Sequence, residues 1–373
     1  MIIFIDIKKL IAFLIILSLI IAIILGFFIW NERTNTTFYD DTLNLKISSK
    51  LEEVFELRNS HIMEGNAEFL KGIFDTEVKS GVWAYEHELK KMKYLHNWSD
   101  KQGIEFTRID SDIVLRNVKN KGDGYALNVM VSTEYKYFYI DSPQKVNSFR
   151  IGSYHSLDLM PHEEKWFITR EWYTDPFADS LHLDELKSKE LQNIILTGEA
   201  KDLSNISEKR LKAIEYADEY CGAASLPEYG FKYNSKYRDY NYLGGDCANF
   251  VSQVLYEGGG FKKNRTWNYE RGAGSKTWIN ASAFNSYMLD SGRASSIAHG
   301  TYDKVLESSY KLLPGDYIAY EVKGKVTHVS LVSGIDSKGY ILVNSHNSDR
   351  YRVPWDLGWS DKGVKFWLVR VNY

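Results

Sequence analysis

The sequence predicts an α+β protein with a transmembrane helix at its N-terminus and two domains behind it. Three observations lead to this fold class. Residues 10–30 form one apolar run, and residues 42–97 have a helical period that gives way to strand-like alternation over 104–173. Residues 207–373 then repeat the order of helices followed by strands. The formal net charge of −3 gives no support for nucleic acid as a partner.

The apolar run at residues 10–30 is long enough to cross a bilayer, which takes about 20 residues. Lys8 and Lys9 precede it, so the positive-inside rule places the N-terminus in the cytoplasm and the rest of the chain outside. A cleavable signal peptide is the alternative, but residues 26–31 contain no small-x-small cleavage site. We therefore expect residues 1–35 to be a single-pass anchor in the cell membrane.

Residues 42–178 form the first predicted domain. Its helical part covers 42–97, and its alternating segments, rich in Val, Ile, Tyr, Phe and Thr, predict antiparallel strands at 104–118, 125–140, 149–161 and 166–173. This order resembles the nuclear-transport-factor-2-like and cystatin-like cone folds. The resemblance implies helices on one face of a curved sheet, and a possible role in binding a protein partner.

Residues 179–206 are charged and predict a connector, and residues 207–373 form the second domain, beginning with a helix after Ser207. The chain has two cysteines, Cys221 and Cys247, which an extracytoplasmic domain can pair as a disulfide. So few cysteines indicate an exported bacterial protein that does not depend on disulfides. If Cys247 is catalytic, both thiols stay free.

Cys247 follows a glycine turn and Asp246, and opens an apolar-periodic segment that predicts a helix. Asp246 is a suitable N-cap residue for that helix. Unpaired N–H groups and the positive dipole end favour a thiolate in the first turn of a helix. The simpler alternative is a small buried cysteine that packs beneath the helix.

A cysteine nucleophile needs a base and a group that orients the base. His328 lies on an alternating strand at 326–332, and a hairpin loop at 335–339 leads into the strand at 340–346. Hairpin pairing is expected to bring Asn344, and by the same alternation His346, to the face that carries His328. Asn344 and His346 are therefore rival candidates for orienting the ring.

Several motifs in order resemble those of the "Putative amidase domain" family of Gram-positive bacteria, over residues 208–373: Asp246-Cys247-Ala248-Asn249-Phe250-Val251-Ser252-Gln253, Trp278, Pro314-Gly315-Asp316, Thr327-His328-Val329 and Asn344-Ser345-His346-Asn347-Ser348-Asp349-Arg350. That family is grouped with the NlpC-type endopeptidases and the CHAP amidohydrolases, which are papain-like cysteine hydrolases. The resemblance implies Cys247 as nucleophile, His328 as base and Asn344 as the third polar residue, with His346 as its rival.

The same resemblance implies that Trp278 and Asp246 contact substrate. Asp246 matches an acidic residue that holds a substrate amine in relatives, although it serves equally well as an N-cap. Ala248 departs from the serine that commonly follows the cysteine in relatives that cut stem peptides. This departure weakens the inference that stem peptides are the substrate.

We therefore expect a membrane-anchored extracellular cysteine amidohydrolase or peptidase that cleaves an amide bond of peptidoglycan by a Cys-His-Asn mechanism. One alternative is a hydrolase of another extracellular peptide or amide, and another is a catalytically silent surface binding or scaffold protein. No cofactor is expected. No metal is expected either, because histidines such as His61, His87, His96 and His155 lack ligand spacing.

Overall fold

The computed structural model describes residues 41–163, 165–177, 189–359 and 363–373. The chain divides into two compact units, residues 1–49 and 50–373, and every contact discussed below lies within the second. The predicted anchor at residues 10–30 lies outside the described residues. Within the described ranges, no helix is both long enough and apolar enough to span a bilayer.

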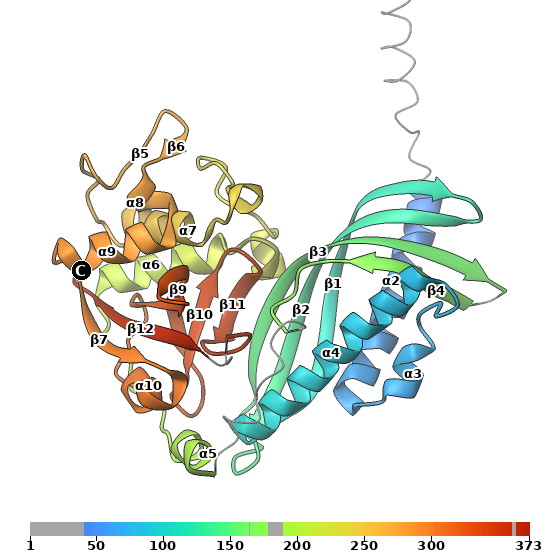
Figure 1. Ribbon diagram of the computed structural model, residues 1–373, viewed down its shortest axis with the longest axis horizontal. Coiled ribbons are helices and arrows are strands. Elements are labelled where there is room, and N and C mark those ends of the chain that lie inside the picture. Colours follow the sequence, from blue (N-terminus) through green and yellow to red (C-terminus); the bar gives the residue numbers. More distant parts are fainter. Residues whose placement is uncertain (1–40, 164, 178–188, 360–362) are drawn as a thin grey trace, which may run out of the picture. The chain divides into compact units, whose positions relative to one another are not determined.

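The first part of the fold has the order that the sequence predicts, with helices followed by strands (Figure 1). The helices are α2 (Asp41–Glu64), α3 (Ala67–Lys71) and α4 (Lys79–Gln102), and the strands are β1 (Ile104–Lys121), β2 (Gly124–Tyr139), β3 (Asn147–His162) and β4 (Lys165–Trp172). Neighbouring strands pair antiparallel, and α4 packs on β4 and β1. Gly103 ends α4 in the left-handed conformation, with φ of 68°, which favours glycine.

The second part begins with α5 (Lys189–Leu196) in the predicted connector and continues with α6 (Glu208–Glu219). The later helices are α7 (Cys247–Gln253), which runs on into a π-helical turn at Val254–Gly258, α8 (Lys276–Ile279), α9 (Ala281–Asp290) and α10 (Tyr302–Ser309). The strands are the short pair β5 (Tyr269–Glu270) and β6 (Ala273–Gly274), then β7 (Ala294–Gly300), β8 (Tyr317–Val322), β9 (Lys325–Ile335), β10 (Ile341–Ser345), β11 (Asp349–Pro354) and β12 (Val364–Val371). The α+β fold class is thus confirmed.

One ten-stranded sheet joins the two parts, in the order β1-β2-β3-β11-β10-β9-β8-β12-β7, with β4 also paired to β3. The junction is the antiparallel pairing of Arg150, Ile151 and Gly152 on β3 with the start of β11. A Cβ at Gly152 would collide with the backbone of Ala223, so glycine is required there for close packing. The sequence gives no sign of this pairing, because edge strands pair through backbone groups that every residue carries.

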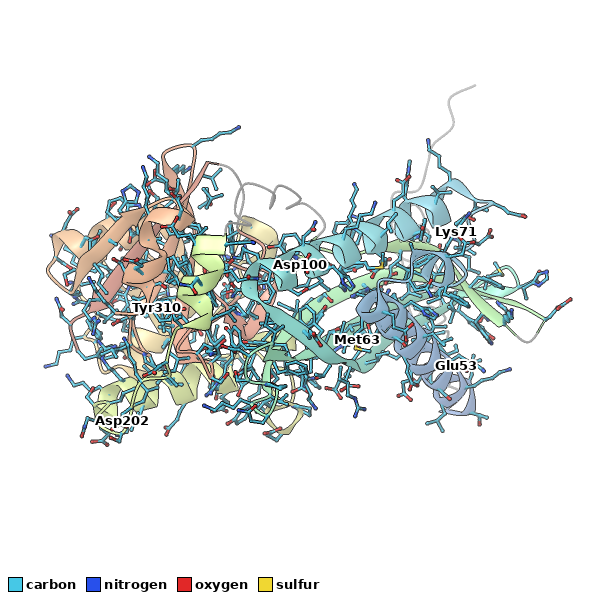
Figure 2. The ribbon with its side chains drawn as sticks, turned by 90° about the horizontal axis from the view of Figure 1, so that it is seen from below. Glu53, Met63, Lys71, Asp100, Asp202 and Tyr310 are labelled. Carbon is cyan, nitrogen blue, oxygen red and sulfur yellow. The ribbon has the colours of Figure 1, made fainter. Side chains whose placement is uncertain are left out.

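Buried side-chain contacts strengthen the same junction. Trp98 and Lys101 of α4 both donate to the carboxylate of Asp356, which also accepts from the hydroxyl of Tyr340. Asp100, labelled in Figure 2, lies near the end of α4, where the side chain of Gln192 on α5 donates to its carbonyl. The sheet and these polar contacts make residues 50–373 one packed body.

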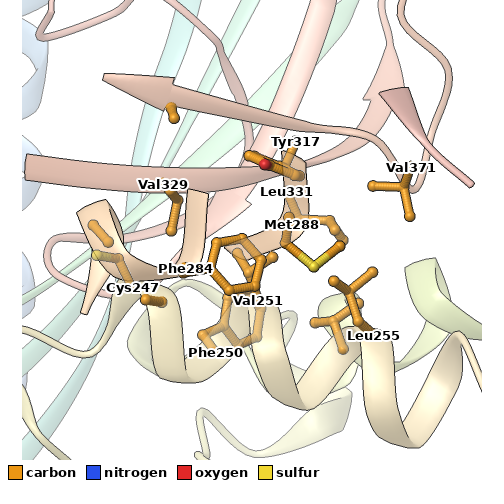
Figure 3. Close-up of a cluster of buried hydrophobic side chains, with 14 of the residues drawn as sticks. Cys247, Phe250, Val251, Leu255, Phe284, Met288, Tyr317, Val329, Leu331 and Val371 are labelled. Carbon is orange, nitrogen blue, oxygen red and sulfur yellow. The ribbon is translucent and has the colours of Figure 1, made fainter. Parts of the chain in front are cut away.

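The core that positions the candidate site lies between β8–β9 and the helices α6, α7 and α9 (Figure 1). Figure 3 shows this cluster, with Cys247 and Val329 at one end and Val251, Met288 and Leu255 further along. Helix α10 packs instead against β7 and β12. Burial of one apolar face of α7 against β9 is what fixes the position of the helix start.

Candidate active site

Cys247 is the first residue of α7, and the loop before it has an unusual backbone. Gly244 and Gly245 have φ angles of 105° and 125°, which residues with side chains rarely adopt. A Cβ at Gly245 would also collide with the side chain of Asn347. Glycine is therefore required for the loop to turn tightly and present Cys247 at the sheet.

The Cys247 thiol lies against β9 and is only 5% exposed. Figure 3 shows it beside Val329. Burial raises the pKa of the thiol to about 11, although the backbone N–H groups of Val329 and Ala248 partly oppose this shift. The thiol is thus neutral at pH 7. The prediction that the helix start favours a thiolate is wrong for this structure, because desolvation outweighs the N–H groups.

His328 lies on β9 directly before Val329, whose backbone N–H contacts the thiol of Cys247. Its ring is buried between Tyr320 and Trp359, with ring centroids 5.4 and 5.0 Å away. Burial and the charge of Arg350 lower the pKa of His328 to about 3. Its Nε2 atom has no hydrogen-bond partner among the described residues. The ring is therefore neutral and keeps a nitrogen able to exchange a proton.

Consecutive strand residues point to opposite faces, so the His328 ring lies on the face opposite Val329. Within the described part of the chain, no hydrogen bond joins His328 to Cys247. The thiol contacts instead the backbone N–H of Val329, the residue that follows His328 on the strand. The structure thus brings the predicted nucleophile and base to neighbouring positions but not into direct contact.

Asp246 and His346 form a buried pair at the start of α7. The His346 Nδ1 lies 2.6 Å from Asp246 Oδ2, and its Nε2 lies 2.7 Å from the carbonyl oxygen of Tyr220. Both partners accept hydrogen bonds, so both ring nitrogens donate and the ring is an imidazolium. Burial disfavours this charge, but the hydrogen bond and charge of Asp246, the charge of Asp349 and the Tyr220 carbonyl raise the pKa of His346.

Asp246 occupies the N-cap position of α7, as predicted, but its side chain makes no capping bond there. Its Oδ1 accepts instead from the backbone N–H of Tyr240 and the side chain of Asn249. Asp246 is 2% exposed, and both of its oxygens are used within the protein. In this state the carboxylate organises the loop and does not face a substrate amine.

The expectation that Asn344 lies on the same face as His328 is also wrong. A register shift between Leu342 and Val343 brings Asn344 opposite Leu331, and so onto the face that carries α7. Asn344 donates to Asp218 and accepts from the backbone N–H of Arg352. A one-residue shift reverses the side-chain faces of a strand. His346 lies on this same face, with its ring 4.1 Å from that of Phe250.

Trp278, predicted to contact substrate, is fully buried in the cluster behind α7. Its Nε1 donates to Asn249 Oδ1 over 2.9 Å, and its ring packs 4.5 Å from that of Trp267. Because Asn249 also donates to Asp246, Trp278 supports the nucleophile loop from behind.

Asn347 is a site residue that sequence reasoning did not single out. Its Oδ1 accepts from the backbone N–H of Asp246 over 2.8 Å, and its own φ of 66° is left-handed. Ser348 is left-handed too, with φ of 59°. Left-handed φ angles at both central residues are what a tight two-residue turn between β10 and β11 requires, and this turn brings the Asn347 side chain to the loop before Cys247. The only available signal was the quoted family motif that contains them.

The remaining predictions concern the second cysteine and metals. Cys221 and Cys247 are both free and buried, and Cys221 donates to the carbonyl of Asp218. In the described ranges, no three His, Cys, Asp or Glu side chains converge as a metal site would require.

Comparison with known proteins relates the part of the chain that carries this site to a protein family. Residues 207–369 match the family model described as "Putative amidase domain". The chain is 26% identical over 153 residues to "Uncharacterized protein YhbB" of Bacillus subtilis (strain 168), covering 39% of this chain and 43% of that protein. It is 30% identical over 170 residues to "Uncharacterized protein YjcM" of the same strain, covering 43% and 36%. The chain thus spans less than half the length of these relatives.

A solved structure whose title begins Rd1NTF2_05 is 14% identical and covers 35% of this chain and 99% of its own. Its TM-score is 0.21, which does not establish a common fold. The family match includes Cys247, His328, Asn344 and His346, and excludes β1–β4.

Proposed function

We propose that the protein is a cysteine amidohydrolase in which Cys247 is the nucleophile and His328 is the general base. One observation carries this assignment. The buried thiol abuts β9 at the residue after a neutral histidine with an unpartnered nitrogen. Both residues lie inside the segment that matches the amidase family model. A thiol and a neutral imidazole in neighbouring positions are the parts that acyl transfer requires.

His328 is the better base of the two candidate histidines because of its free nitrogen. The His346 ring donates from both nitrogens, so it has no lone pair with which to take a proton. We assign His346 and Asp246 a positioning role, in which their ion pair fixes the loop that carries Cys247. Asn344 is not needed to orient His328 in this scheme, because it binds Asp218 and Arg352 instead.

The proposed reaction starts from a neutral thiol and a neutral imidazole. Because the His328 ring lies on the far face of β9, this step requires a local rearrangement of the strand that turns the ring to the α7 face. There His328 takes the thiol proton as the sulfur attacks the amide carbonyl. The N–H groups of the first turn of α7, which precede the first intrahelical bond from Phe250 to Asp246, stabilise the oxyanion. His328 then returns the proton to the leaving amine. Water hydrolyses the resulting thioester, which restores the thiol and releases the acid.

We further propose that the enzyme is papain-like and works on the outer surface of the cell. The apolar run at residues 10–30 supports a membrane anchor, and the basic residues before it support an outward-facing chain. Peptidoglycan is the abundant amide polymer at that location, so an amide bond of the wall is the proposed target.

One observation favours a second candidate function, a catalytically silent surface binding protein. The thiol of Cys247 has a raised pKa and, among the described residues, makes no hydrogen bond to His328, so the site is not activated in this arrangement. A silent protein would keep this arrangement when substrate is bound. In an enzyme, the site would hold this inactive arrangement only while no substrate is bound.

Digestion of purified wall separates these functions. We expect the full-length protein to release soluble fragments with new primary amines from peptidoglycan sacculi, and mass spectrometry of these fragments identifies the bond. Cleavage of unrelated peptides but not sacculi would support a different extracellular substrate. Failure to release amines from either would contradict the hydrolase and favour the silent binding protein.

The pH dependence of kcat/KM tests His328 as the base. Protonation disables this base only below its pKa of about 3, so kcat/KM should stay nearly constant as the pH falls from 8 to 5. A base with the ordinary histidine pKa would lose about 30-fold over that range. His328→Gln should lower kcat by about 10²–10⁴.

Thr327→Val is the matched control for this variant, because the neighbouring side chain is exposed and on the same strand. It should keep its activity. An acidic limb near pH 6.5, or a fully active His328→Gln protein, would contradict the assignment.

A further inference from the structure

Exposed aromatic side chains gather beside the nucleophile loop, where β3 and β4 meet the second part of the fold. A pocket of about 650 Å³ opens there and is lined by Trp172, Tyr154, Tyr242 and Asn347 among others. Trp172 is 68% exposed and Tyr242 is 81% exposed, although large aromatic side chains are normally buried. Aromatic faces left open around a pocket mark a surface that another molecule covers.

The polar groups of the pocket argue against an anionic ligand. Two carboxylates, Asp239 and Asp349, belong to the lining, and each already accepts at least one hydrogen bond from within the protein. Asn241, Asn347, Ser348 and Thr174 offer hydroxyl and amide groups, and the described lining contains no lysine or arginine. A phosphate or nucleic acid ligand would call for such cations. A pyranose ring has an apolar C–H face that matches an indole or phenol face and a rim of hydroxyls that matches these polar groups.

The surface continues past Trp172 into a second pocket. This pocket has a volume of about 600 Å³ and shares Trp172 and Thr174 with the first, and Trp83, which is 59% exposed, lies on its wall. Its arginine, Arg170, is already paired with Asp158 through two hydrogen bonds. Two pockets on either side of one indole, each with a further exposed aromatic ring, fit a chain of sugar units better than a single small molecule.

The first pocket is also connected to the loop that carries the nucleophile, through residues that belong to that loop or bind it. Asn347 lines it and accepts from the N–H of Asp246, the residue before Cys247. Tyr242 stands in the loop that leads to Cys247. A ligand held by these residues therefore contacts the loop that precedes the nucleophile.

We propose that these two pockets form a saccharide-binding site centred on Trp172, which holds the glycan strand of the wall while a neighbouring amide reaches Cys247. The wall as the source of the glycan rests on the proposed function, but saccharide binding itself does not. The sheet junction between β3 and β11 gives this site its geometry, since β3 and β4 supply Tyr154 and Trp172 while the later segment supplies Tyr242 and Asn347.

Binding is measured on the full-length Cys247→Ala protein, which cannot hydrolyse the ligand, by calorimetry with N-acetylglucosamine oligomers of two and six units. Trp172→Ala in this background should weaken both by about tenfold or more. Trp83→Ala should weaken the hexamer and leave the dimer unchanged, because only the longer chain reaches the second pocket. Leu211→Ala, which removes an exposed apolar side chain of α6 outside both pockets, is the matched control.

The proposal is overturned if the oligomers do not bind, if Trp172→Ala binds them like Leu211→Ala, or if free wall peptides without sugar compete at Trp172. Failure of the hydrolase proposal looks different. In that case Cys247→Ala protein binds the oligomers in a Trp172-dependent way, while the wild-type protein releases no amine from sacculi. If instead the wall is cleaved but Trp172→Ala leaves oligomer binding unchanged, the saccharide site alone is wrong.

Discussion

Replacing Cys247 by alanine should abolish amine release from the wall, with a loss of about 10⁴-fold or more in kcat. The reason is that no other group at the start of α7 can form the acyl intermediate. The thiol fills a position in the packed cluster, so alanine leaves only a small void and the protein should stay folded. Amine release and thermal unfolding, measured on the same preparations, check both parts.

Cys221→Ala is the matched control for this experiment. Cys221 is the other free and buried cysteine, and its sulfur contacts only the carbonyl of Asp218 among the hydrogen bonds described. Its replacement should leave the rate unchanged. Activity that survives in Cys247→Ala, or that disappears in Cys221→Ala alone, would show that the nucleophile is assigned to the wrong residue.

The second large effect is on stability. Lys101→Met should lower the free energy of unfolding by about 3–5 kcal/mol, because it removes the buried ammonium that is paired with the buried carboxylate of Asp356. The hydrogen bonds that Trp98 and Tyr340 donate to Asp356 remain, but both donors are uncharged groups. Urea unfolding monitored by tryptophan fluorescence measures the change.

Two further variants make this result specific. Lys212→Met breaks an exposed pair with Glu208 and should barely change stability. The double variant Lys101→Met with Asp356→Leu removes both charges and should recover much of the loss. If Lys101→Met unfolds at the same urea concentration as Lys212→Met, the contact between α4 and the second part of the fold is not as described.

Sequence periodicity was sufficient for the elements but not for their register. The change from helical to alternating period correctly separated α2–α4 from β1–β4, because amphipathic spacing follows from burial of one face. The bulge between Leu342 and Val343 has no such signature, since it depends on how two strands pair. That bulge places Asn344 on the face of α7 and leaves His328 on the other.

The same limit applies to the candidate site. The position of Cys247 at a helix start was predictable from the glycines and the apolar spacing around it. Its protonation state was not, because burial by Val329 and the rest of the cluster depends on tertiary packing. The pairing of β3 with β11, which assembles the aromatic pockets, lies between segments about 200 residues apart and uses only backbone groups.

The central claim is that Cys247 forms a covalent acyl intermediate, and mass spectrometry of an acid-quenched single turnover tests it most directly. The wild-type protein, mixed in excess with a wall-derived peptide substrate, should show the mass of the acyl fragment on the Cys247 peptide. Hydroxylamine should remove that mass, and Cys247→Ala should never acquire it. Amine release at the wild-type rate with no adduct on Cys247, or with an adduct on another residue, would contradict the mechanism.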